Sequence, residues 1–135
     1  MGRALSLMSD AKGNGVGVGW TVTVRGGREL TDLDALAWAV RAAELGAGEI
    51  LLTSVDRDGT QSGFEVALTA AISKTGMVPV IASGGARWPQ HFAEIFREGG
   101  ADAALAASIF HDGIQSIRAL KEFLASEKIQ VRLPC

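Results

Sequence analysis

The stretch GAGEILLTSVDRDGTQSG, residues 46–63, decides the fold of this 135-residue chain. Its short apolar run, residues 50–52, is followed by hydroxyl residues and then by a cluster of charged residues. This pattern is typical of a buried parallel strand that ends in a loop suited to a polar ligand. Two later apolar runs, residues 78–81 and 103–106, end in a similar way in ASGGA and AS. The sequence therefore predicts repeated units of strand, small polar turn and helix.

The ends of these strands suggest a ligand of a particular kind. Each strand reaches glycine or small hydroxyl residues where a helix is expected to begin. Backbone N–H groups are unpaired at such a position and the helix dipole is positive there, so both favour a bound phosphate. A single glycine pair is explained by a turn, but three such turns at successive strand ends favour a phosphate site. We expect Thr53 and Ser83 to point toward the ligand, and Asp58 with Gly59 to supply a backbone N–H.

Composition narrows the class of protein. Hydrophobic residues make up 47% of the chain and charged residues 21%, as in ordinary globular proteins. A net charge of −2 without a basic cluster argues against nucleic acid as a partner. No run is long enough for a membrane span and the first residues do not resemble a signal peptide, so a cytoplasmic setting is expected. The lone Cys135 is read as an incidental thiol.

The periodicity predicts one domain, residues 1–135, made of four βα units. The expected strands are residues 4–8, 49–53, 78–82 and 101–106, and the expected helices are residues 31–45, 64–74, 89–98 and 114–126. Residues 20–24 and the turn at 25–28 suggest a β-hairpin inserted after the first strand. Thr31 and Asp32 are candidate caps of the first helix. Its predicted apolar stripe is Leu33, Leu36, Ala37, Val40 and Leu45. Repeated βα units imply a parallel sheet with right-handed crossovers.

Length limits how much of a closed architecture this chain can form. A complete (β/α)8 barrel needs roughly 200 residues or more. The alanine-rich strand ADAALAA, residues 101–107, suits the interior of a barrel better than an open sheet. The sequence therefore predicts an α/β chain of barrel-like βα units that is too short to close a complete barrel alone.

Four segments identify a family that this chain resembles. GAGEILLTSVDRDGTQSG, VPVIASGGA, GADAALAASIFH, and IRALKEFL with IQVRL are similar to the cyclase (synthase) subunit of imidazole glycerol phosphate synthase, a (β/α)8-barrel enzyme of histidine biosynthesis. The resemblance runs from about residue 5 to 133 and covers the C-terminal half of that barrel. It therefore implies that this α/β chain forms half of a (β/α)8 (TIM) barrel. It implies ammonia-dependent ring closure and cleavage of a phosphorylated, nucleotide-like substrate, with no cofactor.

The resemblance also implies roles for particular residues. Asp10, in the sequence DAK, matches one of two carboxylates that act as general acid and base, although an Asp that caps a turn before Lys12 is the alternative from the residues alone. The second carboxylate lies in a DVKDG-like segment that this sequence does not contain. Glu49 matches a ring of charges through which ammonia from a glutaminase partner enters; from the residues alone it is a surface charge. The positions that surround one substrate phosphate are Asp58, Gly59, Gly84, Gly85, Ala107 and Ser108.

Three hypotheses for function remain open at this stage. The chain is the C-terminal half of the cyclase, with little activity without the N-terminal half. Alternatively, it is a non-catalytic phosphate-binding half-barrel that self-associates as a homodimer, because unpaired sheet edges and an apolar inner face favour association with another copy. In a third hypothesis, a separate polypeptide supplies the missing half. His91 and His111 lack the spacing of metal ligands, so no metal site is predicted.

Overall fold

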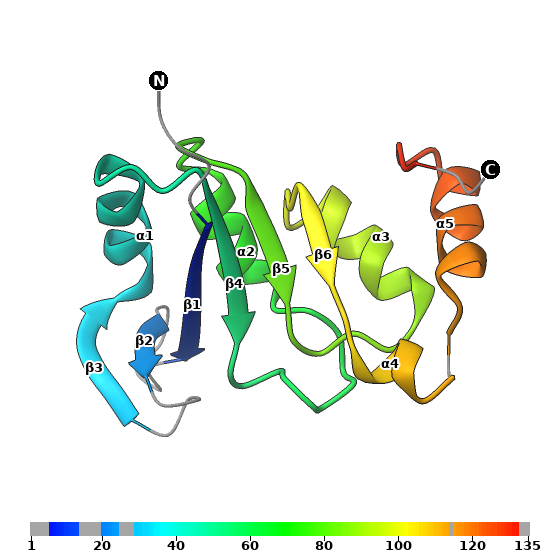
Figure 1. The fold of residues 1–135 in the computed structure, drawn as a ribbon, viewed down its shortest axis with the longest axis horizontal. Helices are drawn as coiled ribbons and strands as arrows, with labels where there is room; N and C mark the ends of the chain where they lie inside the picture. The colour runs from blue at the N-terminus through cyan, green and yellow to red at the C-terminus, as the bar shows by residue number, and fades with distance from the viewer. Residues whose placement is uncertain (1–5, 14–19, 25–28, 114, 133–135) are drawn as a thin grey trace.

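A computed structural model describes residues 6–13, 20–24, 29–113 and 115–132. The turns predicted at residues 14–19 and 25–28, the start of the first expected strand at residues 4–5, and Ile114 lie outside the described residues. The described residues form one six-stranded sheet with helices packed against it (Figure 1). None of the described helices is long and apolar enough to cross a membrane.

The sheet has the strand order β3-β2-β1-β4-β5-β6. Its four parallel strands are β1 (Ser6–Gly13), β4 (Glu49–Ser54), β5 (Val80–Ser83) and β6 (Ala103–Leu105). Two further strands, β2 (Trp20–Val24) and β3 (Glu29–Asp34), pair antiparallel beside β1. The predicted α/β class with parallel strands is confirmed, and the carboxyl ends of the parallel strands lie at one edge of the sheet (Figure 1).

The helices follow the strands along the chain. They are α1 (Ala35–Glu44), α2 (Val66–Ser73), α3 (Pro89–Arg97), α4 (Ser108–His111) and α5 (Ile117–Ser126). Neighbouring helices contact one another in the sequence α1, α2, α3, α5, and α2 and α3 lie behind the sheet in the view of Figure 1. The short helix α4 was not predicted.

The first strand is longer than the sequence predicts. Residues 9–12 were expected to follow the strand, but they lie within β1. The reason is pairing on both sides: Asp10 is in register with Thr23 of β2 and with Thr53 of β4. Asp10 is therefore a strand residue and not the cap of a turn.

The start of the first helix was also predicted wrongly. Thr31 and Asp32 lie in β3, because the antiparallel ladder with β2 continues as far as Asp34. Asp34 is the cap, and its carboxylate accepts a 2.9 Å hydrogen bond from the backbone N–H of Ala37. The predicted apolar stripe is wrong as well, because Leu36 is 38% and Leu45 is 63% exposed. The buried positions of α1 are Ala35, Ala39 and Ala42.

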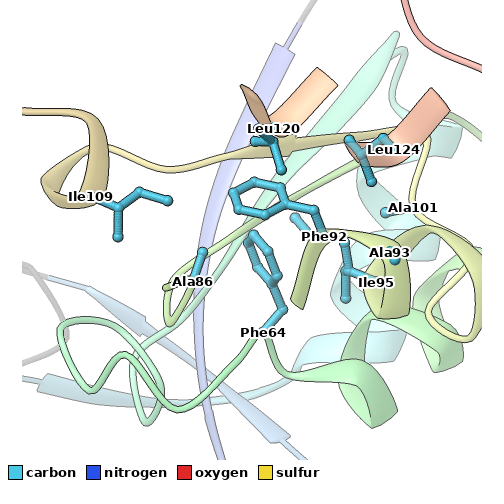
Figure 2. Close-up of a cluster of buried hydrophobic side chains, with 10 residues drawn as sticks. Phe64, Ala86, Phe92, Ala93, Ile95, Ala101, Ile109, Leu120 and Leu124 are labelled. Carbon is cyan, nitrogen blue, oxygen red and sulfur yellow. The ribbon is translucent and has the colours of Figure 1, made fainter. Parts of the chain in front are cut away.

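Two apolar clusters hold the helices against the sheet. In the first, Ile50 and Leu52 of β4 pack with Leu68 and Ile72 of α2. The second cluster lies between α3, α5 and the loops that follow β4, β5 and β6 (Figure 2). There the rings of Phe64 and Phe92 meet edge to face, with centroids 5.2 Å apart. The loops at the carboxyl edge are therefore anchored on a core.

The other face of the sheet is less covered. Along β4 and β5, buried residues alternate with half-buried ones. Leu51 and Ile81 are half-buried neighbours in register, and Leu105 of β6 is 45% exposed. In the described sheet, β6 pairs with β5 alone and so forms its outer edge.

Candidate functional site

A cavity of about 240 Å³ lies at the carboxyl ends of β5 and β6. It is formed by the loop after β4, the loop after β5, and the residues between β6 and α4. Its lining is Asp58, Gly59, Gln61, Ser83, Gly84, Gly85, Ala86, Leu105, Ala106 and Ala107. The position agrees with the general rule that the sites of parallel β/α barrels lie at the carboxyl ends of their strands.

The loops after β4 and β5 approach each other so closely that only glycine fits at two positions. The N–H of Gly63 donates to the carbonyl of Gly85 at 2.8 Å. A Cβ atom on Gly85 would lie 2.1 Å from the carbonyl oxygen of Gly63, and a Cβ on Gly84 would lie 2.9 Å from that of Ser54. Both glycines also have φ angles near +100°, at 97° and 103°. The two glycines are therefore required by the packing of the loops, whatever the ligand.

One of these two glycines leaves a hydrogen-bond donor at the cavity. Gly85 is buried, and its N–H group donates to no acceptor in the part of the chain that the structure describes, whereas the N–H of Gly84 faces β6, where Ser83 pairs with Leu105. Gly59 is exposed, and its N–H group also donates to no acceptor among the described residues. Buried backbone donors without a partner are rare in proteins, so water or a ligand is expected to accept from them. A tetrahedral oxyanion has several oxygen acceptors for such a group of donors.

The structure narrows the predicted donors of the phosphate site. The N–H of Asp58 is not available, because it donates to the carbonyl of Ser54 at 2.9 Å, so Gly59 is the member of that pair that can donate. Of the two helix starts, α3 begins at Pro89, beyond the glycine pair, whereas the four-residue α4 begins at Ser108, directly after Ala107 of the cavity lining. A contribution from the start of α4 stays a prediction.

Arg57 holds the loop after β4 in shape. Its Nε lies 3.3 Å from a carboxylate oxygen of Glu65, and its Nη1 donates to the carbonyl of Ser62. Its own carbonyl accepts from the hydroxyl of Thr60 at 2.6 Å. Because these contacts lie within one loop, they fix the residues that line the cavity.

His91 holds the loop after β5. Its Nδ1 accepts hydrogen bonds from the N–H groups of Arg87 and Trp88, at 3.0 and 3.2 Å. These donors precede the first turn of α3, so the imidazole acts as a cap. Burial lowers the pKa of His91 below its ordinary value of 6.5; Glu94 opposes this effect and Arg57 adds to it. The neutral ring that the cap requires is thus favoured.

The structure brings together most, but not all, of the predicted site residues. Six of them line the cavity: Asp58, Gly59, Ser83, Gly84, Gly85 and Ala107. Thr53 does not line it but is in register with Ser83 on the adjacent strand. Ser108 begins α4 next to it. Asp10 lies in β1, the strand that pairs with β4 beside Thr53. Glu49 begins β4 and so lies at the end of that strand that is opposite the cavity.

One polar residue of the cavity, Gln61, and its partner Arg87 outside the lining were missed from the sequence. Gln61 lines the cavity, and its side-chain oxygen accepts a hydrogen bond from Nη1 of Arg87. The two residues are 26 positions apart, and no local pattern signals such a pairing. Among the described residues, no group of three or more His, Cys, Asp or Glu side chains could hold a metal ion.

The fold and the position of the cavity define a class of protein. A parallel sheet with helices along it, and a glycine-lined cavity at the carboxyl ends of its strands, is consistent with a fragment of the TIM-barrel class. The family described as histidine biosynthesis protein matches residues 2–116. The chain belongs to this family.

Similar curated proteins agree on one description, imidazole glycerol phosphate synthase subunit HisF. The chain is 56% identical over 130 residues to that protein of Metallosphaera sedula, covering 96% of this chain and 51% of the relative. It is 55% identical over 133 residues to that of Acidobacterium capsulatum, covering 98% and 52%. For Pyrococcus furiosus the identity is 57% over 129 residues, covering 96% and 50%. The chain thus spans about half the length of the curated relatives that it matches.

Proposed function

We propose that the cavity binds a phosphate group of a phosphorylated, nucleotide-like substrate, and that the chain forms part of an imidazole glycerol phosphate synthase cyclase. One observation carries the proposal: the buried N–H group of Gly85, at the cavity, has no acceptor within the described ranges. A phosphate would provide this acceptor. The relatives' name supports the substrate class.

In this proposal Asp10 is one of the two acid–base carboxylates of the cyclase. Its backbone lies in β1, beside Thr53 of β4, and β4 in turn pairs with β5, whose end lines the cavity. Ring closure requires one group to take a proton while another gives one. The second carboxylate would come from the portion of the relatives' length that this sequence does not span. We therefore expect little ammonia-dependent turnover from the 135 residues alone.

Glu49 would serve the entry of ammonia. It lies at the amino end of β4, and the cavity lies at the carboxyl edge of the sheet. A nucleophile delivered by a glutaminase subunit at the amino end would reach a substrate at the carboxyl end along the less covered face of the sheet. Glu49 itself is half-buried. This role depends on the cyclase assignment and not on phosphate binding.

A second candidate function is a non-catalytic phosphate-binding module that self-associates. The half-buried side chains of Leu51 and Ile81 and the exposed Leu105 favour it, because an apolar sheet face gains from being covered. The two candidates share the phosphate site and differ in what covers this face. In the cyclase it is the remaining half of the barrel, and in the module it is a second copy of the chain.

Thermal unfolding with and without millimolar inorganic phosphate tests the shared step. A ligand that binds only the folded chain raises the unfolding midpoint by mass action. Gly85→Val is a poor test variant, because a Cβ there would collide with the backbone of Gly63. Gly59→Ala is better: its φ is +79° and its Cβ would meet no atom within 4 Å.

Gly46→Ala is the matched control. Gly46 has a φ of +109°, an equally open Cβ position, and no part in the cavity. Both variants should lose stability through backbone strain, but only Gly59→Ala should also reduce the phosphate-dependent rise in midpoint. No rise in the unmodified chain, or equal rises in all three proteins, would count against a phosphate site in this cavity.

A further inference from the structure

Gln61 is held in a conformation that its side chain disfavours. Its φ is +57°, and among the described residues only Lys128, with φ of +63°, is another non-glycine residue of this kind. The neighbours of Gln61 are fixed by Arg57, which accepts from the hydroxyl of Thr60 and donates to the carbonyl of Ser62. A glycine would adopt this backbone without strain. A strained residue that lines a cavity suggests that its side chain is required there.

The partner of Gln61 determines which atoms its amide presents. Nη1 of Arg87 donates to Oε1 of Gln61. A guanidinium group has only donors, so the oxygen of the amide must face Arg87 and the nitrogen must face elsewhere. The two N–H groups of Nε2 have no acceptor in the described part of the chain, and Gln61 lines the cavity. The amide is thus oriented as a donor toward a ligand.

Arg87 is itself held in place. Its guanidinium carbon lies 4.7 Å from the ring centroid of Trp88, and its backbone N–H donates to His91. No Lys or Arg is among the cavity-lining residues within the described ranges, so Arg87 reaches the cavity through Gln61. A hydrogen bond from a cation polarises the amide and strengthens its N–H groups as donors.

We propose that Gln61 contacts the bound phosphate group, with Nε2 donating to one of its oxygens, and that Arg87 is a positioning residue for Gln61. The inference rests on the proposed phosphate site and adds a side-chain donor to the backbone donor of Gly85. It also explains why a phosphate can bind where, among the described residues, Asp58 is the only charged one in the lining. The ligand class is a phosphate monoester or inorganic phosphate.

Isothermal titration of the full chain with inorganic phosphate tests the proposal. Gln61→Gly should weaken binding about tenfold or more, as expected for loss of a hydrogen bond to a charged group. Its stability without phosphate should be unchanged or higher, because the backbone strain is relieved. Gln61→Asn, which tolerates a positive φ but is one methylene shorter, should also bind more weakly. Lys128→Gly relieves the same strain outside the cavity and should leave phosphate affinity unchanged.

Arg87→Met tests the positioning role. It should weaken phosphate binding in the unmodified chain, but it should have little further effect in the Gln61→Gly background if Arg87 acts through Gln61. Equal weakening in both backgrounds would overturn that role.

The outcomes separate this inference from the proposed function. If the unmodified chain binds phosphate and Gln61→Gly and Gln61→Asn bind as tightly, the role of Gln61 is wrong while the phosphate site stands. If the unmodified chain does not bind phosphate, both proposals fall. Weakening in both Gln61 variants, with Lys128→Gly unaffected, supports the contact.

Discussion

Because His91 caps α3, we predict that its contribution to the free energy of unfolding depends on pH. Substitution of His91 should remove this dependence. Nδ1 of His91 accepts from two backbone N–H groups at the start of α3. Loss of a helix cap costs about 0.5–2 kcal/mol, and an unsatisfied donor costs about 1–3 kcal/mol. His91→Leu should therefore destabilise the chain by roughly 2 kcal/mol at pH 7.5. For a chain of this size, that corresponds to a fall of about 7 °C in the unfolding midpoint.

The sign of the pH effect follows from the direction of the pKa shift. Burial lowers the pKa of His91 in the folded chain, so the unfolded chain takes up a proton first as the pH falls. The contribution of the His91 cap to the free energy of unfolding is fully present above the ordinary pKa of 6.5 and is lost progressively below it. The difference in stability between the unmodified chain and His91→Leu should thus narrow between pH 7.5 and pH 5.5.

Urea unfolding at several pH values within this interval measures the effect. Gln at the same position can cap the helix without titrating, so His91→Gln should keep most of the stability and lose this pH dependence. His111→Gln, at an exposed position, is the control and should behave like the unmodified chain. A difference between the unmodified chain and His91→Leu that stays constant or widens as the pH falls would refute the reasoning.

Four further predictions concern the core, the backbone and the proposed reaction. Ile95→Ala should lower the free energy of unfolding in urea by about 2–5 kcal/mol, because Ile95 is 0% exposed. Its control Ile117→Ala, at a 56% exposed position, should change this free energy by less than about 1 kcal/mol. Lys128→Gly should stabilise the chain by about 1 kcal/mol, since residue 128 follows α5 with φ of +63°; an unchanged urea midpoint would contradict this. Addition of a family N-terminal half with a DVKDG-like segment should raise ammonia-dependent turnover, and Asp10→Asn should abolish it; an active Asp10→Asn complex would show that the acid–base assignment is wrong. Light scattering of the chain alone should show a dimer at micromolar concentration, and a monomer throughout would argue against self-association.

The sequence predicted those elements whose signal is local. The apolar run and charged loop at residues 46–63 identify β4 because a buried strand leaves a contrast in hydrophobicity. β3 was missed because ELTDLD resembles the start of a helix, with Thr31 and Asp32 as caps, and only pairing with β2 makes it a strand. The buried face of α1 consists of alanines, which carry little hydrophobic signal. In β3, tertiary packing overrode local propensity, whereas in α1 only the buried face was misjudged.

At the candidate site, the glycines could be predicted and their partners could not. GG after a strand indicates a tight turn, but only the structure shows that Gly85 lies against Gly63, so that a side chain would collide with backbone. The pairing of Gln61 with Arg87 joins two loops across 26 positions. A glutamine in a polar loop has no distinguishing pattern, and its backbone strain is visible only as a φ angle.

Contacts among the described residues hold the loops that form the cavity, and this separates two properties of the chain. The loops after β4 and β5 hold each other through Gly63 with Gly85 and Gln61 with Arg87, and they rest on the core around Phe64 (Figure 2). Phosphate binding should therefore not depend on anything outside this sequence. Cyclase turnover needs a second carboxylate as well, so it should depend on the remaining half of the relatives' length. A chain that binds phosphate but turns over only when complemented fits the cyclase proposal. If it binds phosphate and complementation restores nothing, the self-associating module is the better account of the same cavity.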